Sequence, residues 1–172
     1  MVSVREAILS RKSVRSFLKK KVSLKIVKEL LYHASLSPSG SNTQPWNVYV
    51  LTGKSLKKFT AESKKEFIEN SKKLSLERLN YMKKYREPYL SRRRKVGWDL
   101  YQILNIKKGD FEKTKSFHSE NYNFFGAPVG LIFSIEKDLG WMSWLDYGMF
   151  MQNICLLARS YGLNTCPQAA WG

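Results

Sequence analysis

The sequence predicts an α/β (α+β) fold in a single domain, with helices and strands that alternate along the chain. Its 172 residues match the usual size of one compact domain, and 43% of them are hydrophobic, which is enough for one core. Some segments repeat apolar residues at helical spacing, and short β-rich runs bounded by proline or glycine interrupt them. The pattern does not determine the order of the strands.

Two helices are expected at the start of the chain. Ser3 and Glu6 have the spacing of a capping box, which predicts a short helix over residues 4–11. A second helix begins after Ser23, where apolar residues line one face. It ends before Pro38, because the residue that precedes a proline disfavours helical backbone.

Two short segments are expected to form buried strands. Residues 47–52 are β-rich, and their large apolar side chains on both faces predict a central strand. Residues 128–135 have the pattern of a second buried strand. Between them, residues 54–85 look helical and amphipathic, whereas residues 85–110 mix aromatics, arginines and breakers, which favours an irregular excursion.

The most apolar helix is expected near the end of the chain. Residues 144–161 are apolar on most sides, and Gly162 follows them as a typical helix stop. Such a helix belongs in a core or in a dimer interface. Residues 163–169 then lead into a third strand or a structured loop.

A net charge of +16 is the main oddity of the composition. Half of the 30 basic residues lie between Lys54 and Lys95, in probable helices. The charge is compatible with nucleic-acid binding, with attraction of anionic small molecules and with a lysine-rich surface. Its regional concentration favours a solvated surface.

Secretion, a membrane span and a metal site are not indicated. Residues 1–13 are charged and lack the apolar run of a secretory signal, and no apolar run reaches the roughly 20 residues that cross a bilayer. Cys155 and Cys166 do not have zinc-binding spacing. We therefore expect reduced thiols, no metal and a cytoplasmic location.

Two polar clusters carry the chemical signal. Residues 11–15 place three cations and a hydroxyl directly after a short helix, where they can bind a phosphate through charge-assisted hydrogen bonds. Residues 37–46 lie between a helix and a strand. Their small residues let the backbone approach a flat heterocycle, and Asn42 and Gln44 offer donors and acceptors. Either cluster alone is common in surface loops.

In their order and spacing, these clusters resemble two motifs of the nitroreductase family. The first is an Arg-x-Ser-x-Arg/Lys motif near the N-terminus, and the second is a Ser-Pro-Ser-x-x-Asn-x-Gln-Pro-Trp motif further along. This chain has Arg11, Ser13 and Arg15, then Ser37, Pro38, Ser39, Asn42, Gln44, Pro45 and Trp46. Residues 127–129, 143–158 and 162–170 are also similar to family segments. Residues 86–98 and 143–149 look closest to the nitrobenzoate-reductase-like branch.

The resemblance implies a nitroreductase-like fold, in which helices flank a mixed central sheet and an intertwined homodimer binds FMN at its interface. The implied cofactor-binding residues are Arg11, Lys12, Ser13, Val14, Arg15, Pro38, Ser39, Gly40, Asn42, Gln44, Pro167, Gln168 and Ala169. Arg11 and Ser13 would hold the phosphate and ribityl chain, and Arg15 would lie beside flavin N1. Residues 38–42 would reach the ring from the other subunit, and residues 167–169 would line the flavin edge near N5.

The implied reaction is ping-pong, in which NADH or NADPH reduces the flavin and a nitroaromatic, quinone or similar electron-poor acceptor then takes the electrons. No catalytic side chain is implied, because the flavin performs the chemistry. Arg92, Arg93 and Arg94 would receive an acidic acceptor, whereas nucleic acid and membrane are not expected as partners. Two alternatives stay open, namely a flavin-binding protein without turnover and a basic nucleic-acid-binding module.

The whole chain, residues 1–172, is expected to form one nitroreductase-like domain. Family members usually continue beyond the segment that matches Gly172, and the additional segment supplies a strand and basic residues for the phosphate. We therefore expect that this sequence lacks the C-terminal extension of the family. An FMN site without that extension would be incomplete.

Overall fold

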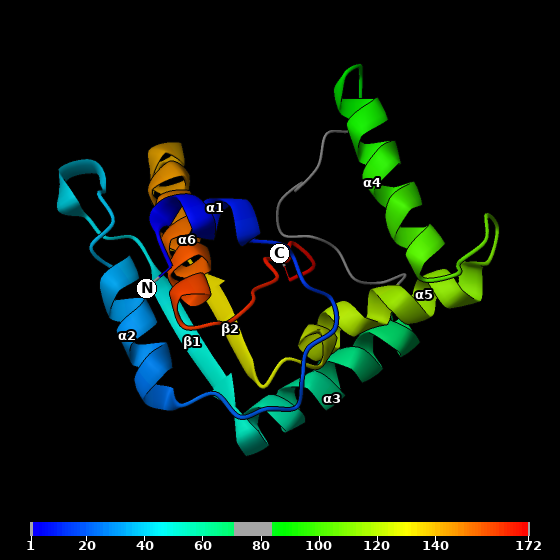
Figure 1. The fold of residues 1–172 in the computed structure, drawn as a ribbon, viewed down its shortest axis with the longest axis horizontal. Helices are drawn as coiled ribbons and strands as arrows, with labels where there is room; N and C mark the ends of the chain where they lie inside the picture. The colour runs from blue at the N-terminus through cyan, green and yellow to red at the C-terminus, as the bar shows by residue number, and fades with distance from the viewer. Residues whose placement is uncertain (1, 71–83, 172) are drawn as a thin grey trace. The chain divides into compact units, whose positions relative to one another are not determined.

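A computed structural model describes residues 2–70 and 84–171 of the chain. Its elements are, in order, α1 (Val4–Ser10), α2 (Leu24–Ala34), η1 (Gly40–Asn42), β1 (Asn47–Thr52), α3 (Gly53–Asn70), α4 (Tyr89–Ile103), α5 (Phe111–Ser119), η2 (Glu120–Gly126), β2 (Val129–Ser134) and α6 (Trp141–Ser160) (Figure 1). The chain divides into two compact units. The first comprises Met1–Phe59 and Phe124–Pro167, and the second comprises Thr60–Asn123 and Gln168–Gly172.

The first unit contains an antiparallel strand pair covered by a helix. β1 pairs with β2 along its whole length. Since paired residues point to the same face of a sheet, Val48, Leu131 and Phe133 lie on one face, where they pack against the core of the unit. α6 supplies most of that core, so it lies across this face of the sheet with α2 packed against it.

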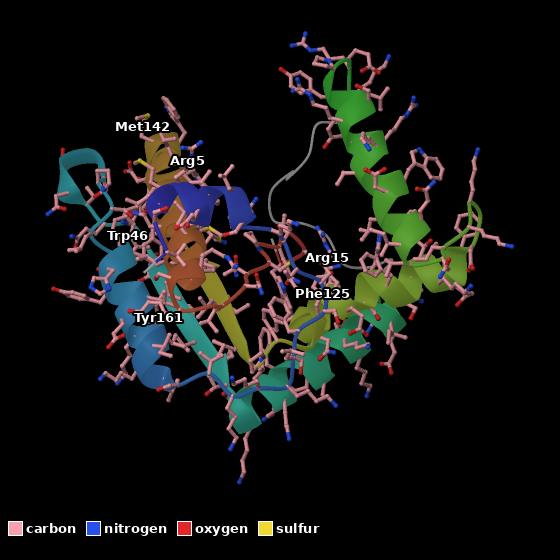
Figure 2. All side chains as sticks on the ribbon, in the orientation of Figure 1. Arg5, Arg15, Trp46, Phe125, Met142 and Tyr161 are labelled. Atoms are coloured by element: carbon pink, nitrogen blue, oxygen red, sulfur yellow. The ribbon has the colours of Figure 1, made fainter. Side chains whose placement is uncertain are left out.

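Aromatic rings fill the space between α6 and the sheet. Phe150 of α6 is only 2% exposed, and its ring stacks on Trp46 with 4.9 Å between the centroids; Figure 2 labels Trp46. Tyr147 lies edge-on to Phe150, and its hydroxyl donates to the carbonyl of Asn47 at 2.7 Å. This hydrogen bond ties α6 to the start of β1, directly after the second polar cluster of the sequence.

The helix ends follow the local signals of the sequence. Ser3 Oγ accepts from the Glu6 amide at 3.2 Å, and the Glu6 carboxylate accepts from the Ser3 amide at 2.7 Å, so the capping box is confirmed. Ser23 caps α2 by accepting from the Lys25 amide. Gly162 follows α6 with a φ of +68°, a left-handed conformation that glycine adopts at little cost.

The two strands agree with the sequence in their extent but not in their burial. β1 was expected to be central, yet Tyr49 is 61% exposed, and within the described residues β1 is paired only with β2. On the face opposite α6, Gly130 is buried. A Cβ added to Gly130 would lie 2.9 Å from the Phe124 ring and 3.1 Å from Leu56. The apolar residues on both faces of β1 therefore do not mark a central strand here.

Residues 85–110 are more regular than the sequence suggested. They contain the helix α4, which begins directly after Pro88 and includes Gly97. Pro88 does not interrupt this helix because it precedes it, and a single interior glycine costs only about 1 kcal/mol relative to alanine. α4 has no buried residue, so the expectation that this segment lies outside the core is confirmed.

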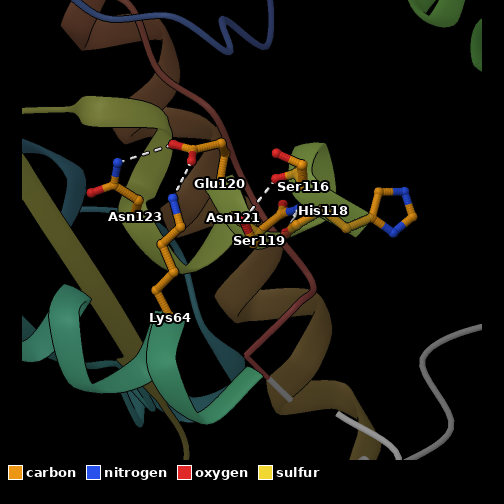
Figure 3. Close-up of polar contacts among 7 residues, drawn as sticks. All are labelled: Lys64, Ser116, His118, Ser119, Glu120, Asn121 and Asn123. Carbon is orange, nitrogen blue, oxygen red and sulfur yellow. Dashed lines mark hydrogen bonds and ion pairs between the residues drawn. The ribbon is translucent and has the colours of Figure 1, made fainter. Parts of the chain in front are cut away.

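In the second unit, α3 is connected to η2 by a polar cluster (Figure 3). The Lys64 ammonium forms an ion pair with the Glu120 carboxylate, which also accepts from Asn123 Nδ2 at 3.0 Å. Burial acts to raise the pKa of Glu120, but these hydrogen bonds and the charge of Lys64 outweigh burial and lower the pKa below its ordinary value of 4.5. The Phe67 ring stacks on Tyr122 at 4.6 Å beside this cluster. The part of the expected helix at residues 71–83 lies outside the described residues.

Candidate cofactor site

The first polar cluster, residues 11–15, pairs with the loop that follows α6. Arg11 ends α1, and its amide donates to the Ala7 carbonyl at 2.9 Å. Ser13 then forms a parallel bridge with Thr165, in which the Val14 amide donates to the Thr165 carbonyl at 3.1 Å. Two segments about 150 positions apart in the sequence are thus joined by an isolated backbone bridge, which lies outside β1 and β2.

Arg159, near the end of α6, holds both sides of this junction. Its Nη1 donates to the Leu163 carbonyl at 2.8 Å and to Asn164 Oδ1 at 2.6 Å. Its Nε donates to Ser10 Oγ at 3.2 Å. One planar guanidinium therefore fixes the end of α1 and the loop after α6, which is the kind of multiple contact that its fork of donors permits.

The Cys166 thiol lies in the loop after α6, and its pKa is shifted by burial and by charge. Burial raises the pKa of the Cys166 thiol, the positive charge of Arg15 acts in the opposite direction, and Cys155 adds a smaller increase. The thiol of Cys166 is therefore protonated at neutral pH, which makes it a poor nucleophile. Both cysteines are free thiols, as expected.

One buried group at the junction has no partner in the described part of the chain. The Oγ1 atom of Thr165 is inaccessible to solvent and makes no hydrogen bond with those residues. Buried hydroxyls are normally satisfied. Thr165 stands opposite Ser13 in the bridge, within the segment pair that carries Arg11, Lys12 and Arg15, so a polar ligand bound there would meet both cations and hydroxyls.

The second polar cluster forms a mostly exposed loop that precedes β1. We refer to residues 37–44 as the Ser37–Gln44 loop. Ser39 organises it, since its carbonyl accepts from the Asn42 amide at 2.9 Å and its Oγ accepts from the Gln44 amide at 3.0 Å. Gln44 Nε2 also donates to Asn42 Oδ1 at 3.3 Å. Pro38, Gly40, Asn42 and Gln44 are exposed, so a ligand can reach them.

Within the first unit, the two clusters contact different parts of α6. The Ser37–Gln44 loop contacts Asp146, in the second turn of α6, through Gly40, and Asn153, near its middle, through Ser37, whereas the junction contacts Arg159, in its last turn. The helical rise to Arg159 is about 20 Å from Asp146 and about 9 Å from Asn153. Arg15 and Trp46 are correspondingly well separated in Figure 2. The structure therefore joins residues 11–15 to residues 162–167 and does not join either to the loop within one chain.

The remaining expected site residues belong to the second unit. Gln168 Oε1 accepts from Trp171 Nε1 at 3.0 Å, and Ala169 follows it in the same terminal segment. Residues 92–94 are exposed on α4. The Arg93 guanidinium lies 4.9 Å from the centre of the Tyr85 ring, a cation–π contact.

Neither a membrane span nor a metal centre is found in the described residues. Between residues 2 and 70 and between 84 and 171, no helix has the length and hydropathy needed to cross a membrane. The same residues contain no group of three or more His, Cys, Asp or Glu side chains that could hold a metal ion.

Sequence reasoning missed three side chains that position these segments, namely Asp146, Asn153 and Arg159. All three are polar residues in a helix whose residues are mostly apolar, and the sequence was interpreted only for the apolar majority. A polar residue within such a helix requires a partner when it is buried. That requirement could have identified these three residues as positions that need a partner.

Known proteins match this chain along most of its length. The family model described as the nitroreductase family matches residues 8–171. The chain is 42% identical over 165 residues to a 4-nitrobenzoate reductase of Pseudomonas putida, which covers 95% of this chain and 71% of that protein. It is 36% identical over 166 residues to a nitrobenzene nitroreductase of Ectopseudomonas oleovorans, covering 96% and 73%.

A solved structure also matches the fold. The FMN and NADPH-dependent nitroreductase NfnB from sphigopyxis sp. strain HMH superposes with a TM-score of 0.94 at 32% identity, and the match covers 98% of this chain and 76% of that one. The fold expected from the sequence resemblance is thereby confirmed.

Proposed function

Because this chain belongs to the nitroreductase family, we propose that it is an FMN-dependent oxidoreductase that uses NADH or NADPH to reduce nitroaromatic compounds, quinones or similar electron-poor acceptors. Its relatives include reductases of 4-nitrobenzoate and nitrobenzene, and NfnB is FMN and NADPH-dependent. The observation that carries the proposal is the bridge between Ser13 and Thr165, because it assembles cations and hydroxyls from two distant segments.

The residues at this junction fit a phosphate-bearing cofactor. Arg11, Lys12 and Arg15 supply positive charge, and the Thr165 hydroxyl lacks a partner in the described residues. Arginine binds phosphate oxygens through two parallel N–H donors, which gives strength and orientation together. We assign Arg11, Lys12, Ser13 and Val14 to the phosphate and ribityl chain.

When bound, FMN supplies the redox chemistry of both half-reactions, hydride acceptance and electron donation. The chain itself binds and orients. Arg15 would hold a cation beside the pyrimidine side of the flavin, where positive charge would favour the anionic reduced state. Pro167, Gln168 and Ala169 form the segment assigned to the flavin edge. The Cys166 thiol, protonated because of its burial, takes no part in the reaction.

The proposal includes a homodimer in which each FMN contacts two subunits. The Gly40 part of the Ser37–Gln44 loop and the junction contact α6 at Asp146 and Arg159, about 20 Å apart along the helix, so we assign Pro38, Ser39, Gly40, Asn42 and Gln44 to the FMN held mainly by the other subunit. Large apolar side chains are exposed on α1 and α6, among them Leu9 at 73% and Trp141 at 77%. These exposed apolar side chains support the proposal of an interface on α1 and α6.

The acceptor proposed for this chain includes acidic nitroaromatics. Residues 92–94 are three adjacent arginines on the exposed surface of α4, and arginine recognises carboxylates by a planar pair of donors. A relative at 42% identity is named for 4-nitrobenzoate, which carries such a carboxylate. We therefore assign Arg92, Arg93 and Arg94 to the carboxylate of the acceptor.

Absorption and turnover of the purified protein test the proposed function. Bound FMN gives bands near ~450 and ~370 nm, because the cofactor carries the chromophore. Steady oxidation of NADH or NADPH with 4-nitrobenzoate or nitrobenzene is the expected activity. Bound FMN without turnover would identify a flavin-binding protein instead, and a folded protein that takes up no FMN would refute the proposal.

A cytoplasmic location, inferred from the two free thiols, is part of the proposal and is tested by cell fractionation.

A further inference from the structure

The Ser37–Gln44 loop has a backbone that needs support from outside the loop. Ser41, Asn42 and Gln44 have φ values of +50°, +57° and +49°, a left-handed conformation that residues other than glycine adopt with strain. Such residues persist when the surrounding structure fixes them. The loop is nevertheless largely exposed, so the fixing contacts must come from a few points.

Two side chains of α6 provide contacts at two points of the loop. The Asp146 carboxylate accepts from the Gly40 amide through Oδ2 at 3.0 Å, and Asn153 Nδ2 donates to Ser37 Oγ at 2.7 Å. Asp146 and Asn153 are seven residues apart, about two helical turns, so they lie on the same face of α6. The same Ser37 hydroxyl donates to the Ala34 carbonyl at 2.7 Å, which links the loop to α2 as well.

Asp146 is an unusual residue for its place in the fold. It is 6% exposed and lies one residue before the core tyrosine of α6. Burying a carboxylate is expensive, and an apolar residue of similar volume often stabilises a fold equally well. Stability alone therefore does not require a carboxylate here, whereas a hydrogen bond from a backbone amide to a charged acceptor is short and directional. The benefit is the fixed position of the Gly40 peptide.

We infer that Asp146 is a positioning residue for the flavin site, with Asn153 as a second support for the same loop. The inference rests on the proposed function, since residues 38–44 are assigned to FMN there. Asp146 fixes the peptide of Gly40, and through it the side chains of Ser39 and Asn42 that would meet the flavin. It acts through the loop and does not touch the cofactor itself.

Three substitutions separate positioning from general stability. Asp146→Leu keeps the branching at Cγ and removes the acceptor, whereas Asp146→Asn keeps an acceptor oxygen. Asp138→Leu applies the same change to an exposed aspartate just before α6. The dissociation constant of FMN is measured by quenching of flavin fluorescence, the thermal midpoint by circular dichroism, and the exchange rate of the Gly40 amide by hydrogen–deuterium exchange.

Asp146→Leu is expected to weaken FMN binding by about tenfold, the effect of one lost hydrogen bond to a charged group, and to speed exchange at Gly40. Asp146→Asn is expected to restore most of the affinity, and Asp138→Leu to leave it unchanged. Wild-type affinity in Asp146→Leu, or affinity that simply follows the thermal midpoint in all variants, overturns the inference while leaving the proposed function intact.

Two further results complete the test. If the wild-type protein binds no FMN, the proposed function fails, and the inference fails with it. If Asp146→Leu does not fold, Asn153→Ala decides instead, because it removes the other support of the loop. Weaker FMN binding in Asn153→Ala, together with near-normal binding in Asp146→Asn, supports the inference, and unchanged binding in Asn153→Ala overturns it.

Discussion

Removing the guanidinium of Arg159 is expected to loosen both sides of the proposed phosphate site. Arg159→Met keeps most of the apolar stem and loses hydrogen bonds to Ser10 Oγ, the Leu163 carbonyl and Asn164 Oδ1, which measure 3.2, 2.8 and 2.6 Å. Hydrogen bonds to charged groups are each worth about 1.5–3 kcal/mol when buried. Arg159 is half-buried and Ser10 and Asn164 are exposed, so solvent reduces the sum to roughly 2 kcal/mol.

Thermal unfolding and FMN titration measure this effect. A loss of 2 kcal/mol corresponds to a fall in Tm of roughly 4–8 °C for a chain of this size, and the FMN dissociation constant is expected to rise as well. Arg5→Met is the matched control, because Arg5 is exposed on α1. Arg159→Lys is expected to recover only part of the loss, since an ammonium lacks the fork of donors. A Tm and an FMN affinity equal to wild type in Arg159→Met would show that the guanidinium does not hold the two segments together.

Three further predictions concern packing, pH and the acceptor. Gly130→Ala forces a Cβ against the Phe124 ring and a Leu56 methyl and is expected to lower the free energy of unfolding by about 1–3 kcal/mol. In Gly97→Ala the added Cβ meets nothing within 4 Å, and the free energy of unfolding is expected to rise by roughly 0.5–1 kcal/mol. Denaturant titrations that give the two variants the same stability would contradict this prediction. Because the pKa of Glu120 is lowered, its contribution to stability is complete above pH 4.5 and is lost as pH falls through the folded-state pKa. Glu120→Gln is therefore expected to flatten the fall in stability below pH 4.5. If stability depends on pH below 4.5 in the same way in Glu120→Gln and in the wild type, the Lys64 pair does not contribute. Replacing Arg92, Arg93 and Arg94 with alanine is expected to raise KM for 4-nitrobenzoate and to spare nitrobenzene, and an equal effect on both acceptors would remove the proposed carboxylate contact.

The fold could be predicted wherever a local signal decides the backbone. The capping box of Ser3 and Glu6, the stop at Gly162 and the extents of β1 and β2 all depend on neighbours in sequence. The burial of β1 depends on which strands pair with it, and that information is not local. The helix α4 was missed because Pro88 was interpreted as an interruption when it in fact precedes the helix.

The residues of the candidate site that would meet a ligand could be predicted from the sequence. The residues that hold them in place could not. Arginine, serine and amide side chains in an exposed cluster indicate a polar ligand by their chemistry. Asp146 meets Gly40 and Arg159 meets Ser10, each more than 100 positions away in the sequence. Periodicity places them on α6 but does not reveal which loop they meet.

In the proposed dimer, residues 11–15 of one subunit and the Ser37–Gln44 loop of the other enclose one FMN. A mixture of two inactive variants, Arg11→Ala/Arg15→Ala and Asn42→Ala/Gln44→Ala, tests this arrangement by equilibrium binding of FMN after the subunits exchange. Random pairing in a twofold-symmetric dimer makes half of the dimers mixed, each with one intact site, so about a quarter of the wild-type sites are expected. If both clusters served the same FMN from a single chain, every site in the mixture would carry a lesion, and no FMN binding above that of the separate variants would be recovered.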